Sequence, residues 1–167
     1  VVVIDNIESR LEMIREHGAT LTISNGVDAA KDKVFELTKG RGADVVYDIT
    51  GNAKVLAPAL NLARRYGVVV LLGDTGHTQQ QHIAPNLIVS GLRLVGAHAS
   101  HIPEHASEFQ PWSMVRCYDL FLHYLATQQM HVIRLVTHRF KPHQAHEAYV
   151  LMKERRGLTM GVVFDWE

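Results

Sequence analysis

Val1-Val-Val-Ile-Asp-Asn-Ile-Glu-Ser-Arg-Leu11 is the stretch of sequence that decides the fold. Its first four residues are apolar and mostly β-branched, without the apolar–polar alternation of a half-buried strand. A continuous apolar run of this kind predicts a strand buried on both faces, as in parallel sheets. Asp5 follows the run directly, so we expect its carboxylate at the carboxyl end of the strand, where open α/β sheets bind their ligands.

Asp5 has two interpretations that the residues alone leave open. In sheets that bind dinucleotides, an acid in this position accepts the ribose hydroxyls, about 20 residues after a glycine-rich phosphate loop. The alternative is a helix N-cap, because helical spacing begins immediately afterwards. The sequence contains no G-x-G-x-x-G loop, and nothing precedes Val1. We therefore interpret the sequence as a piece from the middle of a longer protein.

The composition excludes several classes of protein. Lys plus Arg and Asp plus Glu both number 17, so no net charge favours nucleic acid or an anionic membrane surface. One cysteine, Cys117, excludes an internal disulfide and a zinc site built of several cysteines. No apolar run approaches the roughly 18 residues of a membrane span, and no signal peptide precedes the first strand. We expect a cytoplasmic protein.

Strand-like and helix-like segments alternate along the chain. The expected strands are 1–5, 20–24, 43–50, 68–72, 92–97 and 161–165, with an extended segment at 132–139. The expected helices are 7–17, 27–39, 52–66, 113–129 and 143–153, with a helical turn at 86–90. In the helix over 113–129, the spacing predicts a buried face made of Val115, Leu120, Tyr124 and Leu125.

This alternation predicts an α/β fold with a Rossmann-like, doubly wound and mostly parallel sheet. In the usual strand order 3-2-1-4-5-6 the first strand is central. If residues 1–5 form the second strand, the sheet lacks its first strand and its glycine-rich loop, and two strands each lose a hydrogen-bonding neighbour. We expect residues 1–167 to form one partial dinucleotide-binding domain, from the second strand to the last helix and strand, with no catalytic domain in this chain.

Further motifs extend the opening stretch in a fixed order along the chain. They are Thr38-Lys-Gly-Arg-Gly-Ala-Asp-Val-Val46, Gly67-Val-Val-Val-Leu-Leu-Gly73, Ala145-His-Glu-Ala-Tyr149 and Gly161-Val-Val-Phe164. Each motif alone is weak, but their ordered succession resembles the zinc-containing medium-chain alcohol dehydrogenase superfamily, in its carboxyl-terminal, nucleotide-binding part.

The resemblance implies that the cofactor is NAD and that particular residues bind it. Asp5 would accept both ribose hydroxyls, and Arg10 would lie over the adenosine. Because Asp5 would repel a 2′-phosphate, NAD is favoured over NADP. The remaining implied contacts lie where later strands end: Thr50, Gly51, Leu72, Gly73, Asp74, Ala97 and His98. Simple turn formation is the alternative role for Gly51 and Gly73.

The resemblance also implies an activity and an assembly. A small-molecule alcohol or polyol would give a hydride to NAD, and zinc would enter only through the missing catalytic domain. This segment would have no catalytic residue of its own. Two or four copies would join through the edge strand near Leu92–Gly96, as a homodimer or homotetramer, with no nucleic acid or membrane as partner.

Three alternatives stay open. A zinc-free quinone reductase of the same superfamily would use NADPH, and Asp5 argues against it. A methyltransferase also ends its second strand in an acid that holds ribose. The third alternative is a non-catalytic, truncated Rossmann module that acts by oligomerisation or partner binding, and the absent phosphate loop favours it.

The chain has 11 histidines, and those of the polar loops are candidates for a metal site. These candidates are His77, His82, His98, His101 and His105. None of them pairs with another at the i, i+4 spacing on a clear helix, and no cysteine or carboxylate cluster joins them. We interpret them as surface histidines and assign no metal ligand.

Overall fold

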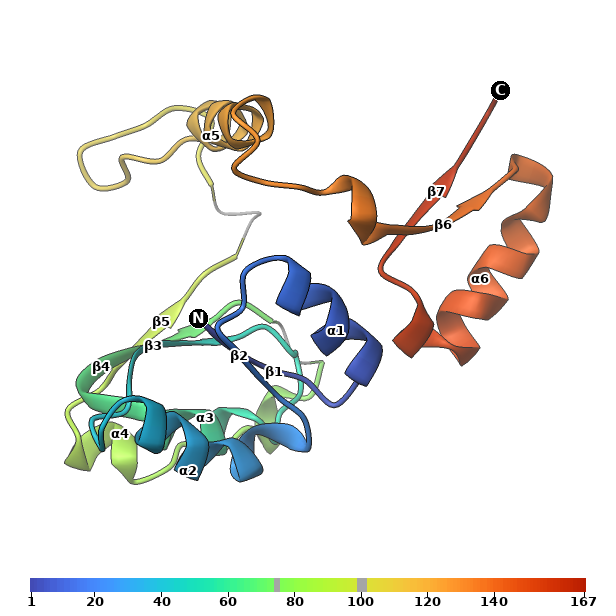
Figure 1. Cartoon of the computed structure of the whole chain (residues 1–167). Helices are drawn as coiled ribbons and strands as arrows, with labels where there is room; N and C mark the ends of the chain where they lie inside the picture. Colours follow the sequence, from blue (N-terminus) through green and yellow to red (C-terminus); the bar gives the residue numbers. More distant parts are fainter. Residues whose placement is uncertain (74–75, 99–101) are drawn as a thin grey trace. The chain divides into compact units, whose positions relative to one another are not determined.

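The computed structural model describes residues 1–73, 76–98 and 102–167. The chain divides into two compact units, Val1–His101 and Ile102–Glu167, and each is described by itself. Unit 1 contains β1 (Val2–Ile4), α1 (Glu8–Glu16), β2 (Leu21–Ile23), α2 (Gly26–Leu37), β3 (Ala43–Asp48), α3 (Leu56–Leu60), β4 (Ala63–Leu71), α4 (Asn86–Val89) and β5 (Arg93–Gly96). Unit 2 contains α5 (Met114–Ala126), β6 (Val136–Phe140), α6 (Ala145–Glu154) and β7 (Gly161–Phe164) (Figure 1). Within the described residues, no helix is both long enough and apolar enough to cross a membrane.

The opening stretch forms the predicted strand and helix. β1 pairs in parallel with β2, so that Val2 lies opposite Leu21. α1 follows after a short connection and buries Leu11 completely. Gly18, with φ of +93°, ends this helical stretch, because glycine adopts the left-handed conformation without the steric penalty of a side chain.

β3, β4 and β5 form a three-stranded parallel sheet with β4 in the middle. Helices α3 and α4 cover one face of this sheet, where Leu60 and Val69 are completely buried. The other face carries Tyr47, Val70 and Val95 in register across the three strands. Tyr47 is 64% exposed, so this second face is largely open within unit 1.

α2 packs against both sheets of unit 1 (Figure 1). Its Ala30 and Val34 form a buried cluster with Ile23 and Leu62. Side chains from β1, β2 and β3 pack on that cluster, among them Val2, Ile4, Leu21, Ala43 and Val46. The two sheets therefore share one hydrophobic core, although they are not hydrogen-bonded to each other.

The expected parallel pairing is confirmed, because every strand pair in the described residues is parallel. The expected single sheet is not formed. Among the described residues, β1 has only β2 as a neighbour and β3 has only β4, so the described part of unit 1 contains two sheets. The division falls between β1 and β3, where the order 3-2-1-4-5-6 places the first strand. No strand in the described residues bridges these two edges, and that is the physical reason for the split.

The helix predicted over 52–66 is wrong in its length. α3 covers only Leu56–Leu60, and the chain is already extended in β4 from Ala63. The Leu60 carbonyl accepts a hydrogen bond from the Asn86 side chain at 2.9 Å, and the Leu62 carbonyl accepts one from the Ala43 amide at 2.9 Å. Because both carbonyls bond outside the helix, the helical pattern ends here.

Unit 2 contains a two-stranded parallel sheet of β6 and β7, together with α6, which buries Ala148 completely. The segment expected to be extended from residue 132 begins instead with a 3-10 turn over Ile133–Leu135. The buried face predicted for α5 is only partly present: Leu120, Tyr124 and Leu125 are half-buried. None of the residues of this helix is buried, and Val115 is 57% exposed. Its helical pattern is correct, but unit 2 supplies no core for it.

Candidate functional site

The predicted site residues lie where the parallel strands of unit 1 end. Asp5 follows β1 directly, Arg10 lies in α1, and the other predicted residues come after β3, β4 and β5. The residues that follow those three strands are Thr50, Gly51, Leu72, Gly73, Ala97 and His98. Asp74 lies outside the described residues. Parallel pairing brings the carboxyl ends of β3, β4 and β5 to one edge of their sheet, whereas Asp5 lies at the corresponding edge of the β1–β2 sheet.

Asp5 and Arg10 lie close together. The distance between Arg10 Nη1 and Asp5 Oδ2 is 3.9 Å, and the two side chains are 29% and 31% exposed. The other carboxylate oxygen, Oδ1, accepts a hydrogen bond from the Ile7 amide at 2.9 Å. One oxygen of the Asp5 carboxylate is therefore fixed by a hydrogen bond. The side chain is also partly exposed to solvent and lies next to the cation Arg10.

The N-cap interpretation of Asp5 is wrong in detail. α1 begins at Glu8, and its N-cap residue is Ile7, which makes no side-chain capping bond. Asp5 binds the amide of that N-cap residue, so it fixes the turn before the helix. This contact uses one oxygen only, and a carboxylate has further lone pairs for other donors.

Sequence reasoning gave no role at the site to Asp48, the last residue of β3. Its side chain is buried, and its Oδ1 accepts hydrogen bonds from the Thr50 amide at 3.0 Å and from the Thr50 hydroxyl at 2.7 Å. The Thr50 hydroxyl in turn accepts a bond from the Asn52 amide at 3.1 Å. The signal for this arrangement was the Asp-x-Thr spacing, since an aspartate at a strand end commonly binds the backbone two residues on.

The ends of β3 and β4 pass each other very closely. A Cβ atom at position 73 would lie 2.4 Å from the Gly51 nitrogen and 2.8 Å from the Ile49 carbonyl carbon. The amides of Leu72 and Gly73 both donate to the Asp48 carbonyl, at 2.9 and 3.1 Å. Gly51 has a φ of +64°, a left-handed conformation. Gly51 therefore has the turn conformation that was the alternative role for these two glycines, and Gly73 allows the close approach of the backbones.

β5 continues the same edge. The Ala97 amide donates to the Leu71 carbonyl at 2.8 Å, which extends the pairing of β4 and β5 past the last residue of the strand. His98 follows and is exposed. The structure therefore brings Thr50, Gly73 and Ala97 to neighbouring strand ends through backbone hydrogen bonds.

The amino end of the same sheet carries a separate charge cluster. Asp44 accepts from Arg64 Nε at 2.6 Å and from Arg41 at 3.0 and 2.9 Å. The hydrogen bond from Arg64 is the main cause that holds the pKa of the Asp44 carboxyl below its usual value, and the charge of Arg41 acts in the same direction. This cluster is exposed and includes none of the predicted site residues.

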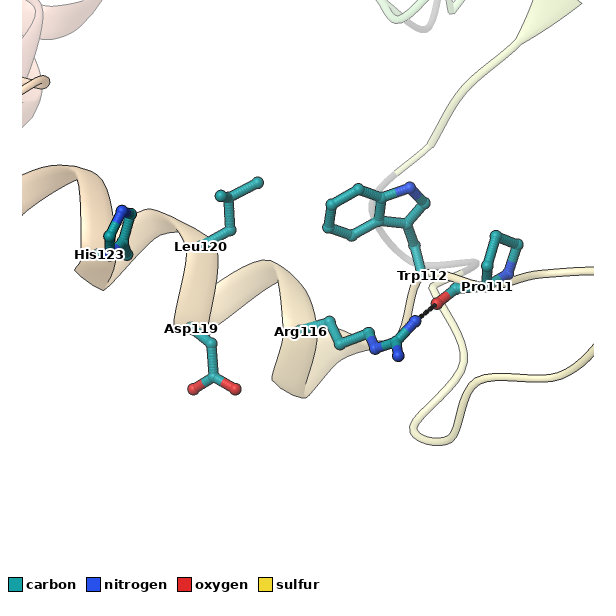
Figure 2. A pocket seen from close by; sticks show the side chains of 6 residues that line it. All are labelled: Pro111, Trp112, Arg116, Asp119, Leu120 and His123. Carbon is teal, nitrogen blue, oxygen red and sulfur yellow. Dashed lines mark hydrogen bonds between the residues drawn. The ribbon is translucent and has the colours of Figure 1, made fainter.

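A hollow of about 530 Å³ lies beside α5 in unit 2 (Figure 2). It is lined by Pro111, Trp112, Arg116, Asp119, Leu120 and His123, and Arg116 Nη1 donates to the Pro111 carbonyl at 2.7 Å. None of the predicted cofactor residues lines it. In the described part of the chain, no three His, Cys, Asp or Glu side chains come together as a metal site would require. His101, one of the candidate metal ligands, lies outside the described residues.

Comparison with known proteins identifies relatives of the sequence. The profile of the zinc-binding dehydrogenase family matches residues 1–114. An L-threonine 3-dehydrogenase from Symbiobacterium thermophilum is 30% identical over 152 residues, which are 91% of this chain and 40% of the relative. A zinc-type alcohol dehydrogenase-like protein from Escherichia coli is 28% identical over 157 residues, which are 91% of this chain and 39% of the relative. The chain spans about two fifths of the length of these curated relatives.

Solved structures show the same fold. An alcohol dehydrogenase from Escherichia coli, solved in complex with NADH, superimposes with a TM-score of 0.77 at 19% identity, over 99% of this chain and 44% of that chain. An alcohol dehydrogenase from a Thermus species gives a TM-score of 0.76 at 23% identity, over 99% of this chain and 44% of that chain. At these identities the likeness shows a Rossmann-like arrangement of parallel strands.

Proposed function

The chain belongs to the zinc-binding dehydrogenase family, and we propose that it is the nucleotide-binding part of an NAD-dependent alcohol dehydrogenase. The reaction would be the oxidation of an alcohol or polyol, with hydride transfer to NAD. The single observation that supports this most strongly is the carboxylate of Asp5 at the end of β1. The family match also removes the methyltransferase alternative.

Asp5 suits the binding of a ribose with two free hydroxyls. The Asp5 side chain is 31% exposed and its Oδ2 lies beside Arg10, so this oxygen can accept hydroxyl donors while Oδ1 keeps its bond to the Ile7 amide. A 2′-phosphate in the same position would meet a negative charge, which disfavours NADP and a quinone reductase that uses NADPH. We propose Arg10 as the positive neighbour of the adenosine.

The ends of β3, β4 and β5 would receive the rest of the cofactor. Gly73 has no side chain, so the backbone there can approach a ligand closely. Thr50 and Leu72 are exposed at the same edge, and we propose that they contact NAD together with Gly51, Asp74, Ala97 and His98. When NAD is bound it supplies the hydride acceptor, and the residues of this chain bind and orient it.

The described residues do not fit a zinc site. Among them, no cluster of three ligating side chains exists, so we derive no step through the metal. We propose that zinc belongs to a catalytic domain outside residues 1–167, and that these residues form one partial dinucleotide-binding domain. A cytoplasmic location stays a prediction.

We propose that copies of the protein associate through β5. This strand lies at the edge of its sheet, where β4 is its only neighbour among the residues that the structure describes, and Val95 on it is 44% exposed. An apolar strand with a free edge is a site for pairing with another chain. Pairing of β5 with the β5 of a second copy would give the expected homodimer or homotetramer, and light scattering of the purified protein measures it.

The test of the proposed function is a direct assay. The full-length polypeptide that carries residues 1–167 is incubated with NAD and, in separate reactions, with L-threonine, simple primary and secondary alcohols, and polyols. The absorbance of NADH is followed. L-Threonine is included because relatives are L-threonine 3-dehydrogenases. Formation of NADH with at least one alcohol supports the proposal. No NADH with any alcohol, together with no NAD binding in calorimetry, would refute it.

A second candidate is a non-catalytic module that acts by oligomerisation or partner binding. The observation in its favour is that β1 and β3 each have one unpaired edge within the described residues of unit 1. Calorimetry separates the two candidates. A protein that self-associates but binds neither NAD nor NADH is the module, whereas binding of NADH identifies the dehydrogenase part.

A further inference from the structure

Asp48 occupies a special position at the candidate site, because two of its groups hold two different strand ends. Its carboxylate binds Thr50, which follows β3. Its backbone carbonyl accepts the amides of Leu72 and Gly73, which follow β4. One residue therefore links three of the residues that we propose to contact NAD.

The burial of Asp48 makes this linkage a strong one. The residue is 4% exposed, and a carboxylate removed from water is costly unless it accepts hydrogen bonds. Its Oδ1 receives two donors from a single residue, the amide and the hydroxyl of Thr50. Hydrogen bonds to an ionised acceptor are stronger than neutral ones, so they fix both the backbone and the side chain of Thr50.

The hydrogen bonds also determine how Thr50 can meet a ligand. A threonine hydroxyl has one proton to donate and two lone pairs. The proton is directed to Asp48, and one lone pair accepts the Asn52 amide at 3.1 Å. The group left for a ligand is the second lone pair. Thr50 can therefore accept a hydrogen bond from an N–H or O–H donor of the ligand. It cannot donate one to the ligand as long as its hydroxyl donates to Asp48.

We propose that Asp48 is a positioning residue for cofactor binding, which acts through Thr50 and presents its hydroxyl as an acceptor toward an N–H or O–H donor of the adenosine. This inference rests on the proposed function, since NAD is the ligand concerned. Asp48 itself, being buried, stays behind the binding surface and does not touch the cofactor.

The chain offers a matched set of variants for the test. Asp48→Ala removes the acceptor, whereas Asp48→Asn keeps an oxygen in the place of Oδ1 and replaces Oδ2 by an uncharged NH2 group. Thr50→Val removes the hydroxyl, and Thr50→Ser keeps it. Asp44→Ala is the control, because Asp44 lies on the same strand but at its amino end, paired with Arg41 and Arg64.

The experiment is a fluorescence titration of the full-length polypeptide with NADH, combined with thermal unfolding of each variant. We expect Asp48→Ala and Thr50→Val to raise the Kd for NADH about tenfold, because each loses a hydrogen bond to a charged or oriented group. Asp48→Asn and Thr50→Ser should stay within about threefold of the wild type, and Asp44→Ala should leave the Kd unchanged. A merely structural role would lower the unfolding temperature of Asp48→Ala and leave its Kd at the wild-type value.

Wild-type affinity in a folded Asp48→Ala variant overturns the proposal. If that variant does not fold, Thr50→Val tests the same contact from its other side, and wild-type affinity there overturns it equally. If the wild-type protein binds no NADH, that result refutes the proposed function and does not test the role of Asp48. Amide hydrogen exchange without ligand then decides whether Asp48 positions the edge: faster exchange of the Thr50 amide in Asp48→Ala supports this, and unchanged exchange refutes it.

Discussion

The backbone of Gly73 passes so close to Gly51 that a side chain at position 73 would place its Cβ atom 2.4 Å from the Gly51 nitrogen. Real Cβ atoms do not approach other heavy atoms to that distance. The neighbouring atoms are backbone atoms of Ile49 and Gly51, which cannot rotate away as a flexible side chain would. The close approach of the two strand ends therefore requires glycine at position 73.

Gly73→Ala should separate the carboxyl ends of β3 and β4. We expect the free energy of unfolding to fall by about 1–3 kcal/mol, the usual cost of an added methyl group in a packed site. The affinity for NADH should fall as well, because the bonds from Leu72 and Gly73 to Asp48 would be disturbed. Urea unfolding and NADH titration measure the two effects.

Gly96→Ala provides the control for that variant. Gly96 lies at the end of the neighbouring strand β5, and a Cβ atom there would meet nothing within 4 Å. Its unfolding midpoint should stay close to that of the wild type. An equal loss of stability in both variants would show that the close approach of the backbones at Gly73 is not the cause.

Asp5→Ser should shift cofactor preference from NAD toward NADP. The substitution removes a carboxylate that would accept the ribose hydroxyls and repel a 2′-phosphate. We expect the KM for NAD to rise about tenfold while that for NADP falls. Steady-state kinetics with both cofactors measure this, with Asp32→Ser on the exposed side of α2 as the control. An unchanged preference would refute the ribose role.

The ion pairs of Asp44 should make stability depend on pH in the acid range. Because the pKa of Asp44 is lowered in the folded protein, chiefly by the Arg64 hydrogen bond, its stabilising effect is complete above the unfolded pKa and is lost as pH falls toward the folded value. Wild type should therefore exceed Asp44→Asn in urea midpoint at about pH 6 and approach it below about pH 4.

Arg64→Gln supplies the partner variant for a double-mutant cycle with Asp44→Asn. Both changes remove the same interaction. At neutral pH the double variant should therefore lose less free energy of unfolding than the two single variants lose in sum. Strict additivity would show that the 2.6 Å contact between Arg64 and Asp44 does not stabilise the protein.

Leu11→Ala should destabilise unit 1 strongly. Leu11 is the only buried residue of α1 and has no exposed surface. Removal of a fully buried leucine costs about 2–5 kcal/mol, partly through the cavity it leaves. Leu122→Ala on α5, where the side chain is 59% exposed, should change stability by less than about 0.5 kcal/mol. Thermal unfolding of both variants gives the comparison.

The 167-residue chain by itself should bind NADH weakly. It contains no glycine-rich loop, and the helix amino terminus that would hold the pyrophosphate in a dinucleotide-binding sheet is therefore absent from residues 1–167. We expect no saturation at micromolar NADH in calorimetry, where a complete dehydrogenase of the family serves as the positive control. A micromolar Kd for the chain alone would contradict this prediction.

Local features of the sequence were sufficient to predict most of unit 1. The apolar run before Asp5 gave β1, and the helical spacing after it gave α1 with Leu11 inside. Asp5 and Arg10 came together as a consequence, because they flank the start of one helix. The ordered motifs also identified the family, which the profile match over residues 1–114 confirms.

Features that depend on distant contacts were not predictable. α3 ends early because Asn86 and Ala43 take carbonyls that would have continued the helix, and both residues are remote in sequence. The amphipathic pattern of α5 is real, but periodicity alone cannot say whether a core exists to cover it. Asp48 was given no role from the sequence, because the role of a buried acid at a strand end depends on its hydrogen bonds, here to Thr50.

In the parts of the chain that the structure describes, every strand pairs only with a strand adjacent to it in chain order: β1 with β2, β3 with β4, β4 with β5, and β6 with β7. Such pairing keeps each strand pair within one strand–helix–strand segment of the chain. The β1–α1–β2 segment can form its hydrogen bonds before β3 exists as a strand. During synthesis on the ribosome, each strand–helix–strand segment could therefore fold as it emerges, before the segments that follow it.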